Sequence, residues 1–238
     1  MRPDAVVFDL FGTLVPEFSR SDFYGAVRTA AEILGCDPEA FERGWVRTGA
    51  LRQTGAYAGG MAENVRAIVA ELGGGEPAED VVIAALATRT ALYDRLFHPR
   101  VGALETLREV KARGYPVALI SMCAPDTPER WRASEMAPFV DVAIFSSETG
   151  LRKPDAEIYL TACRELGVEA ERCLYCGDGA YGELSGAAAV GMTAYLIRPP
   201  DLDVAEALTP ELEQDWRGPT IGDLRELLDL LEPSVEPV

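Results

Sequence analysis

Residues 5–15 read Ala-Val-Val-Phe-Asp-Leu-Phe-Gly-Thr-Leu-Val, and this stretch decides the fold. Its opening β-branched and aromatic residues favour a short strand that is buried on both faces. Asp9 follows the strand directly, and Gly12 permits a tight turn that a Cβ would obstruct. Because a parallel sheet carries its chemistry just beyond the carboxyl ends of its strands, we expect Asp9 at the open edge of a sheet. Asp9 either caps a turn there or takes part in catalysis, and its partners further along the chain distinguish the two roles.

The composition limits the class of partner. Of the 238 residues, 48% are hydrophobic, as in a globular protein with a sizeable core. The formal net charge of -17 disfavours nucleic acid and anionic membranes, because the average field of the protein repels phosphate. A small anionic substrate is compatible with this charge, since local donors determine such binding. No apolar run approaches the ~18 residues of a membrane span, so we expect no membrane association.

The cysteines show no paired spacing and are Cys36, Cys123, Cys163, Cys173 and Cys176. An odd number of scattered cysteines predicts free thiols in a reducing compartment, and we expect a cytoplasmic protein. Cys173 and Cys176 match C-x-x-C, but they lie in an apparent strand without a second pair or a nearby histidine. We therefore interpret them as buried thiols and not as metal ligands.

A helical pattern fills residues 16–97. Apolar residues recur there at spacings of three and four in the segments 21–34, 38–51, 61–72 and 77–97, with Gly-rich breaks between most of them. Four helices without an intervening strand predict a compact helical insertion after the first strand.

From residue 98 onwards, strands and helices alternate. Strands are predicted at 116–121, 140–146, 173–177 and 193–197, and helices at 101–113, 126–134, 155–166, 183–190 and 221–231. Strands separated by helices of this length pair in parallel through right-handed crossovers. The fold class is therefore α/β: residues 1–15 and 98–238 form a Rossmann-like doubly wound sheet, and residues 16–97 form an inserted α-helical domain. The tail 232–238 is expected to fray.

Polar side chains follow the ends of several predicted strands. Ser121 ends one strand, Lys153 lies one short loop after the next, and Asp178 and Glu183 follow a third. The carboxyl ends of parallel strands meet at one edge, so these side chains would surround Asp9 in one crevice. Each of them also has an ordinary structural role as a strand-end cap or a first-turn residue. Lys153 carries extra weight, because the chain contains only two lysines.

These motifs resemble those of the haloacid dehalogenase-like hydrolase superfamily in kind and in order. Residues 9–13 match the first motif of that family, D-x-D-x-T, in part, and Ser121 matches the second. Lys153 in Arg-Lys-Pro matches the third motif, and Gly177-Asp178 with Glu183 matches the fourth. The helical insertion lies where one class of this family carries its cap domain, after the first motif. The resemblance covers about residues 4–198.

The resemblance implies a two-step reaction on a small anionic substrate. Asp9 would be the nucleophile and form an ester or an aspartyl phosphate that water then cleaves. Lys153 and Ser121 would stabilise the phosphoryl oxygens. Mg²⁺ would be the cofactor, and its expected ligands are Asp9, the backbone carbonyl of Phe11, Asp178 and Glu183. The residues expected to bind substrate are Phe11, Gly12, Thr13, Met122 and, in the cap, Arg47 and Arg52.

The sequence departs from the family pattern at Phe11. Family phosphatases carry a second Asp there, which protonates the leaving oxygen and later activates water, and Phe11 can do neither. Family dehalogenases often have an aromatic residue at this position, so a 2-haloacid dehalogenase is the first alternative. A degenerate site in a non-catalytic binding protein is the second.

The fourth motif favours the phosphatase. Family dehalogenases work without metal and replace its Gly-Asp, whereas Gly177-Asp178 and Glu183 keep acidic ligands suited to Mg²⁺. Met122-Cys123 also stands where family dehalogenases have Asn-Gly. We therefore expect a Mg²⁺-dependent phosphatase that acts on a small phosphorylated metabolite and lacks the usual general acid.

Overall fold

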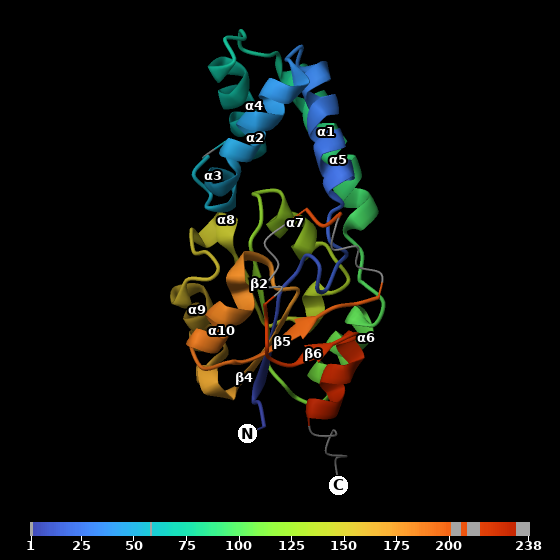
Figure 1. The fold of residues 1–238 in the computed structure, drawn as a ribbon, viewed down its shortest axis with the longest axis vertical. Helices are drawn as coiled ribbons and strands as arrows, with labels where there is room; N and C mark the ends of the chain where they lie inside the picture. Colours follow the sequence, from blue (N-terminus) through green and yellow to red (C-terminus); the bar gives the residue numbers. More distant parts are fainter. Residues whose placement is uncertain (1, 58, 201–205, 209–214, 232–238) are drawn as a thin grey trace.

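A computed structural model describes residues 2–57, 59–200, 206–208 and 215–231, and the structural statements below concern these residues. The tail 232–238, expected to fray, lies outside them. Figure 1 shows two parts, a sheet covered by helices at the bottom and a cluster of helices above it. No helix in the described ranges combines the length and the apolar composition needed to cross a bilayer.

The sheet contains six strands in the order β3-β2-β1-β4-β5-β6, all paired in parallel. The strands are β1 (Ala5–Phe8), β2 (Val117–Ser121), β3 (Val142–Phe145), β4 (Cys173–Gly177), β5 (Thr193–Ile197) and β6 (Thr220–Ile221). The first strand lies in the middle, with β2 and β4 on either side of it. This order confirms the predicted doubly wound α/β fold.

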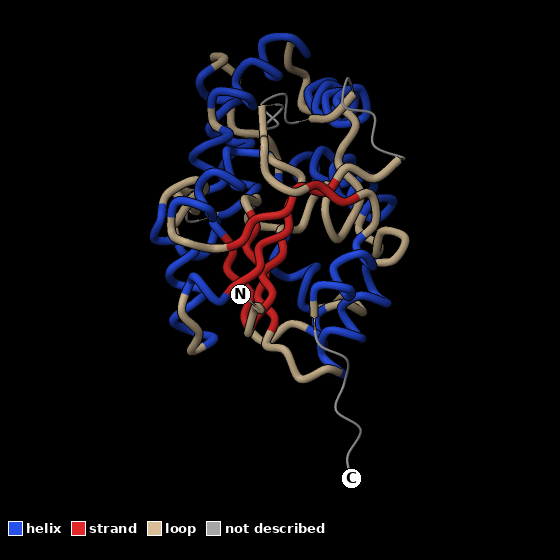
Figure 2. Tube along the Cα trace, turned by 60° about the horizontal axis from the view of Figure 1, so that its bottom comes forward, coloured by secondary structure: helices blue, strands red, loops and turns tan. Residues whose placement is uncertain are grey.

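Helices cover both faces of this sheet (Figure 2). The α-helices of this part are α6 (Ala103–Ala112), α7 (Thr127–Arg132), α8 (Ser146–Thr149), α9 (Ala156–Leu166) and α10 (Glu183–Ala189). Its 3-10 helices are η1 (Ala137–Phe139), η2 (Ala170–Arg172), η3 (Ala180–Gly182) and η4 (Leu224–Leu230). Val6 and Phe8 of β1 pack with α6 and η4 on one face, while Ala5 and Val7 pack with α9 and α10 on the other. The central strand is thus apolar on both faces, as predicted from its composition.

The predicted helix at 221–231 is wrong in its first residues and in its type. Residues 220–221 form the short edge strand β6, which pairs with β5 and removes Ile221 from any helix. Asp223 then begins a 3-10 helix: its carboxylate accepts the Arg225 N–H at 2.9 Å, and Glu226 accepts the Asp223 N–H at 2.9 Å. This reciprocal cap satisfies the N–H groups at the start of the helix.

The helical insertion forms a separate cluster with its own apolar core (Figure 1). Its helices are α1 (Arg20–Ile33), α2 (Pro38–Arg47), α3 (Gly49–Gln53), α4 (Gly60–Glu71) and α5 (Glu79–Leu96). The structure divides the single helix predicted at 38–51 into two helices at Thr48. The Thr48 hydroxyl donates to the Gly44 carbonyl at 2.9 Å, and the next residue is Gly49. Such local hydroxyl bonding competes with helix continuation.

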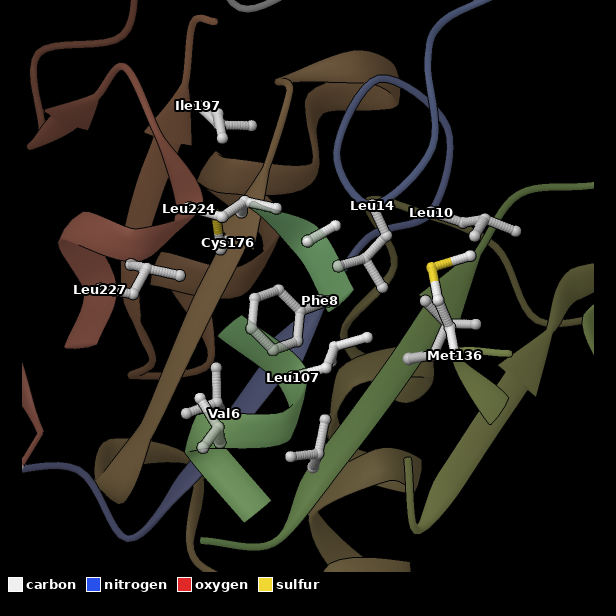
Figure 3. Packing of buried hydrophobic residues seen from close by; sticks show 14 of the residues in the cluster. Val6, Phe8, Leu10, Leu14, Leu107, Met136, Cys176, Ile197, Leu224 and Leu227 are labelled. Carbon is white, nitrogen blue, oxygen red and sulfur yellow. The ribbon is translucent and has the colours of Figure 1, made fainter. Parts of the chain in front are cut away.

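The loop after β1 is anchored in the main core. Figure 3 shows Phe8 at the centre of this core, with Leu10, Leu14 and Leu107 around it. Leu10 and Leu14 flank the turn at Gly12 and are fully buried. Their burial fixes the backbone on both sides of the turn, and so it holds Asp9 at the sheet edge.

Truncation of Phe8 tests the dependence of the fold on this core. The side chain is 0% exposed, so Phe8→Ala should lower the free energy of unfolding by about 3–5 kcal/mol through lost burial and a cavity. Urea unfolding followed by circular dichroism measures the change. The control is Ile83→Ala on α5, which is 60% exposed and should change stability by less than about 0.5 kcal/mol. Equal effects of both substitutions would contradict the assignment of Phe8 to the core.

Candidate active site

Three adjacent strands deliver the predicted polar side chains to one edge of the sheet. Asp9 follows β1, Ser121 ends β2 and Asp178 follows β4. Lys153 reaches the same edge from the loop after α8, and Glu183 is the first residue of α10. All five side chains are buried, with exposed fractions between 0% and 6%. The structure therefore brings together the residues that the strand-end pattern grouped.

The Lys153 ammonium lies between two carboxylates. Its Nζ donates to Asp9 Oδ1 at 2.5 Å and to Glu183 Oε2 at 2.5 Å. Glu183 is itself held by two further donors, the Tyr175 hydroxyl at 2.6 Å and the Gly179 N–H at 2.9 Å. Both oxygens of Glu183 are thus occupied. Glu183 thereby positions Lys153. Its predicted role as a metal ligand stays a prediction, and its carboxylate lies close enough to those of Asp9 and Asp178 to share a cation with them.

Asp9, Asp178 and Glu183 form the acidic cluster of the site. Their carboxylate oxygens lie within 4.8 Å of one another. Asp9 Oδ2 and Asp178 Oδ2 are buried and have no hydrogen-bond partner in the described part of the chain. Unpaired buried oxygens are costly, and a hard divalent cation such as Mg²⁺ is the partner that two carboxylates fit best. With Lys153 charged, the ionised cluster would carry two net negative charges, which Mg²⁺ balances.

Gly12 allows the first loop to approach Asp178. Its φ is +79°, and a Cβ at this position would lie 2.3 Å from Asp178 Oδ2. Any side chain here would therefore strain the backbone and displace the carboxylate. The prediction of a turn at Gly12 is confirmed, and the close approach explains why the turn needs glycine.

The charges of the cluster shift the pKa values of its members. Burial raises the pKa of Asp9 to about 6, with a further rise from the charge of Glu183 and an opposing effect from Lys153. Burial and the charges of Glu183 and Asp9 raise the pKa of Asp178 well above its usual range. Burial alone would lower the pKa of Lys153, but the charges of Asp9 and Glu183 outweigh it and raise the pKa. Without a metal, the site thus keeps Lys153 charged and shifts the titration of the Asp9 and Asp178 carboxyls to higher pH.

A cavity of about 110 Å³ opens beside Asp9, between the sheet and the helical insertion. The insertion contributes Phe23, Gly49, Arg52, Gln53, Arg89 and Tyr93 to its walls, and the sheet part contributes Phe11, Met122, Cys123, Ala124, Ala180 and Tyr181. Two contacts join the parts at its rim: Gln53 Nε2 donates to the Tyr181 hydroxyl at 2.8 Å, and Arg89 Nε donates to Asp126 Oδ2 at 2.6 Å. A volume of several water molecules between these walls suits a small metabolite.

The two candidate arginines of the insertion have different environments. Arg52 lines the cavity and is buried. Arg47 is absent from the cavity wall, because it is exposed on α2 and forms an ion pair with Glu71 of α4. The structure therefore does not bring Arg47 to the cavity, and its role in substrate binding stays a prediction.

The remaining predicted site residues lie near Asp9 in different ways. Met122 lines the cavity, and its sulfur accepts the Lys153 N–H at 3.3 Å. Thr13 and Ser121 are fully buried, and their hydroxyls have no hydrogen-bond partner among the described residues. They are therefore available to an anion that reaches the strand ends. Their predicted roles, like that of the Phe11 carbonyl, stay predictions.

The Phe11 ring belongs to an aromatic cluster at the base of the insertion. Its centroid lies 5.0 Å from that of Phe18, 6.0 Å from that of Tyr93 and 6.2 Å from that of Phe97. These contacts join the first loop of the sheet part to helix α5 and to the segment that follows it. Position 11 therefore packs the two parts together instead of presenting an acid to the substrate.

Glu17 is a site residue that no motif indicated. Among the described residues that line the cavity, Asp9 and Glu17 are the only carboxyls. Burial raises the pKa of Glu17 to about 7, and the Phe18 N–H, which Glu17 Oε1 accepts at 2.8 Å, opposes the rise in part. The one signal available in the sequence was its place on the loop after residues 5–15.

Sequence comparisons agree with this geometry. A family model described as haloacid dehalogenase-like hydrolase matches residues 3–191. Phosphoserine phosphatase of Thermus thermophilus is 30% identical over 205 residues, which cover 83% of this chain and 76% of that protein. (S)-2-haloacid dehalogenase 4A of Burkholderia cepacia is 26% identical over 254 residues, which cover 97% and 96% of the two chains.

The fold also matches that of a solved structure. The 2-haloacid dehalogenase of Pseudomonas syringae superimposes with a TM-score of 0.67 at 18% identity, covering 96% of this chain and 97% of that chain. At this identity the match supports the shared fold, including the inserted helices. It does not distinguish between phosphate and halide as leaving group.

The acidic cluster predicts how stability depends on pH without metal. A carboxyl whose pKa is higher in the folded protein than in the unfolded chain stabilises the fold at low pH, and this contribution is lost as pH rises through the folded value, about 6 for Asp9. In EDTA, the temperature of the thermal midpoint should therefore decrease as the pH is raised from 5.5 to 8. Adding Mg²⁺ at pH 8 should raise it again. Differential scanning calorimetry measures both changes.

Two variants separate this effect from the general negative charge. Asp178→Asn should raise the midpoint in EDTA at pH 8 by about 2–6 °C, because it removes one charge from the cluster. Asp215→Asn removes an exposed carboxylate and should leave the midpoint unchanged. The acidic cluster would be contradicted as a cation site if Asp178→Asn lowered the midpoint or if Mg²⁺ left the midpoint unchanged.

Proposed function

Because the chain belongs to the haloacid dehalogenase-like hydrolases, we propose that this hydrolase is a Mg²⁺-dependent phosphatase that acts on a small phosphorylated metabolite. One observation carries the proposal: the carboxylates of Asp9 and Asp178 lie close together beside Lys153, and each has a buried oxygen without a partner among the described residues. A reaction without metal would leave Asp178 as a buried carboxyl without a function. A Mg²⁺ ion bound by both carboxylates would give both oxygens a partner and would offset the charge of a dianionic phosphate.

The chain supplies the covalent chemistry through Asp9. The Asp9 carboxylate attacks phosphorus, the substrate oxygen leaves with the bonding electron pair, and an aspartyl phosphate forms. Water then attacks phosphorus, which releases phosphate and restores Asp9. Lys153 holds Asp9 Oδ1 throughout and thereby orients the attacking carboxylate. Mg²⁺, when bound by Asp9 and Asp178, supplies positive charge to the phosphoryl oxygens.

Glu17 is the group that donates the proton which Phe11 cannot supply. Its carboxyl lies in the same cavity wall as Asp9. The pKa of about 7 leaves much of Glu17 protonated near neutral pH, whereas burial raises the pKa of the Cys123 thiol to about 11. A general acid is most effective when its pKa lies near the working pH. Glu17 therefore suits both protonation of the leaving oxygen and later activation of water.

Haloacid dehalogenation is the alternative, and Phe11 is the observation that favours it. An apolar ring beside Asp9 suits a halide, which leaves without a proton. The relative named as a haloacid dehalogenase spans nearly the whole chain. In that reaction the free oxygen of Asp178 would have no role, which is why we rank the phosphatase first.

Two assays distinguish these reactions. The purified protein should release phosphate from 4-nitrophenyl phosphate with Mg²⁺ and lose this activity in EDTA, because the buried carboxylates need a cation. It should release no chloride from 2-chloropropionate. Asp9→Asn should reduce phosphate release to background, since it removes the nucleophile. Chloride release that persists in EDTA would overturn the phosphatase.

Replacement of Glu17 tests its role as proton donor. Glu17→Gln should lower kcat/KM for an alkyl phosphate such as glycerol 3-phosphate by ~10²-fold, the usual worth of a general acid. It should have little effect on 4-nitrophenyl phosphate, whose leaving group needs no proton. In the wild type, alkyl turnover should decline above pH of about 7, because the donor must be protonated.

Glu32→Gln, on the exposed face of α1, is the matched control and should leave both substrates unaffected. An equal loss on both substrates after Glu17→Gln would indicate a structural role. An unchanged pH profile for the alkyl phosphate in Glu17→Gln would also rule out Glu17 as the donor.

A further inference from the structure

We propose that the Arg52 guanidinium binds a carboxylate of the substrate, so that the enzyme acts on phosphorylated carboxylic acids. The inference rests on the proposed phosphatase function, because it places the carboxylate relative to a phosphoryl group at Asp9. Both residues line the same cavity. Asp9 belongs to the sheet part, and Arg52 enters from α3 of the insertion.

Arg52 is held in one orientation by neutral groups. Its Nη1 donates to Thr48 Oγ1 at 2.7 Å and to Asn64 Oδ1 at 3.0 Å. The guanidinium carbon also lies 4.1 Å from the centroid of the Trp45 ring, within cation–π distance. These contacts fix the guanidinium plane and leave its other nitrogens without a hydrogen-bond partner among the described residues. A planar group with free donors at a cavity wall is suited to bidentate binding of a carboxylate.

The charge of Arg52 is not balanced by any described carboxylate within 4 Å, although the side chain is only 7% exposed. Burial and the nearby charge of Arg89 lower the pKa of Arg52 to about 9. Arg89 provides the comparison: its guanidinium binds both oxygens of Asp126, at 2.6 Å and 3.1 Å. The cavity therefore has one guanidinium that the protein neutralises and one that it leaves for a ligand.

A single unbalanced guanidinium matches a carboxylate better than a second phosphate. A carboxylate brings one negative charge, whereas a phosphate monoester brings up to two near neutral pH. Trp45 adds a neutral donor to this region, because its Nε1–H is buried without an acceptor among the described residues and the ring borders the adjoining cavity. Neutral hydrogen-bond donors strengthen binding of a monoanion without adding charge.

A matched pair of substrates tests the carboxylate. 3-Phosphoglycerate and glycerol 3-phosphate share a phosphorylated three-carbon chain. They differ at its other end, which is a carboxylate in the first compound and a hydroxymethyl group in the second. The wild type should favour 3-phosphoglycerate in kcat/KM by tenfold or more, as expected of a charge-assisted bidentate contact. Arg52→Met should remove most of this preference, and Arg52→Lys should restore only part of it, because an ammonium is not planar. Arg43→Met, at an exposed arginine of α2, is the control and should keep the preference.

A binding measurement tests the carboxylate site independently of the proposed phosphatase activity. Both phosphates are titrated into Asp9→Asn protein with Mg²⁺ by calorimetry, which requires no turnover. Tenfold tighter binding of 3-phosphoglycerate, lost in the Asp9→Asn/Arg52→Met double variant, would support the carboxylate site even if phosphatase assays fail. Equal affinities, or a preference that persists without Arg52, would overturn it. Circular dichroism confirms that each variant is folded.

Discussion

The position of the Lys153 ammonium between Asp9 and Glu183 is the interaction on which the site depends. Two 2.5 Å contacts link the ammonium to carboxylates from two different elements, in surroundings with almost no access to water. Moving such charges out of water is costly, and their mutual attraction offsets the cost only if every partner is well placed. The Tyr175 hydroxyl and the Gly179 N–H provide this placement by fixing Glu183. Lys153 in turn fixes the carboxylate of Asp9.

With its carboxyls ionised, this cluster carries two more negative charges than Lys153 balances. The free oxygens of Asp9 and Asp178 are a local cost that a well-packed core tolerates, and the layers around Phe8 and Tyr175 supply that packing. The same excess of negative charge creates affinity for a divalent cation. Stability and function therefore oppose each other at this edge of the sheet, and a bound cation would reconcile them.

The helical insertion completes the cavity and changes what the first loop must do. Phe11 packs against Tyr93 and Phe97, so the position that family phosphatases give to an acid is used here to join the two parts. Glu17 lies on the same connection and faces the cavity. In the proposed mechanism, Glu17 would supply the proton while Phe11 packs the two parts together. Arg89 adds a second junction, because its pairing with Asp126 links α5 to the loop before α7.

The sequence by itself determined the doubly wound sheet and the grouping of five side chains at one edge: Asp9, Ser121, Lys153, Asp178 and Glu183. These predictions depend on local patterns and on one general rule, that parallel strands end at a common edge. Tertiary structure alone decided the place of Glu17 in the cavity wall, the partners of Glu183 and the different environments of the two arginines of the insertion. Arg47 lies in the helix predicted at 38–51 and Arg52 directly follows it, but the break at Thr48 leaves the first exposed and places the second in the cavity wall. Burial, hydrogen bonding and pairing of a side chain depend on segments far away in the sequence, and no local pattern records them.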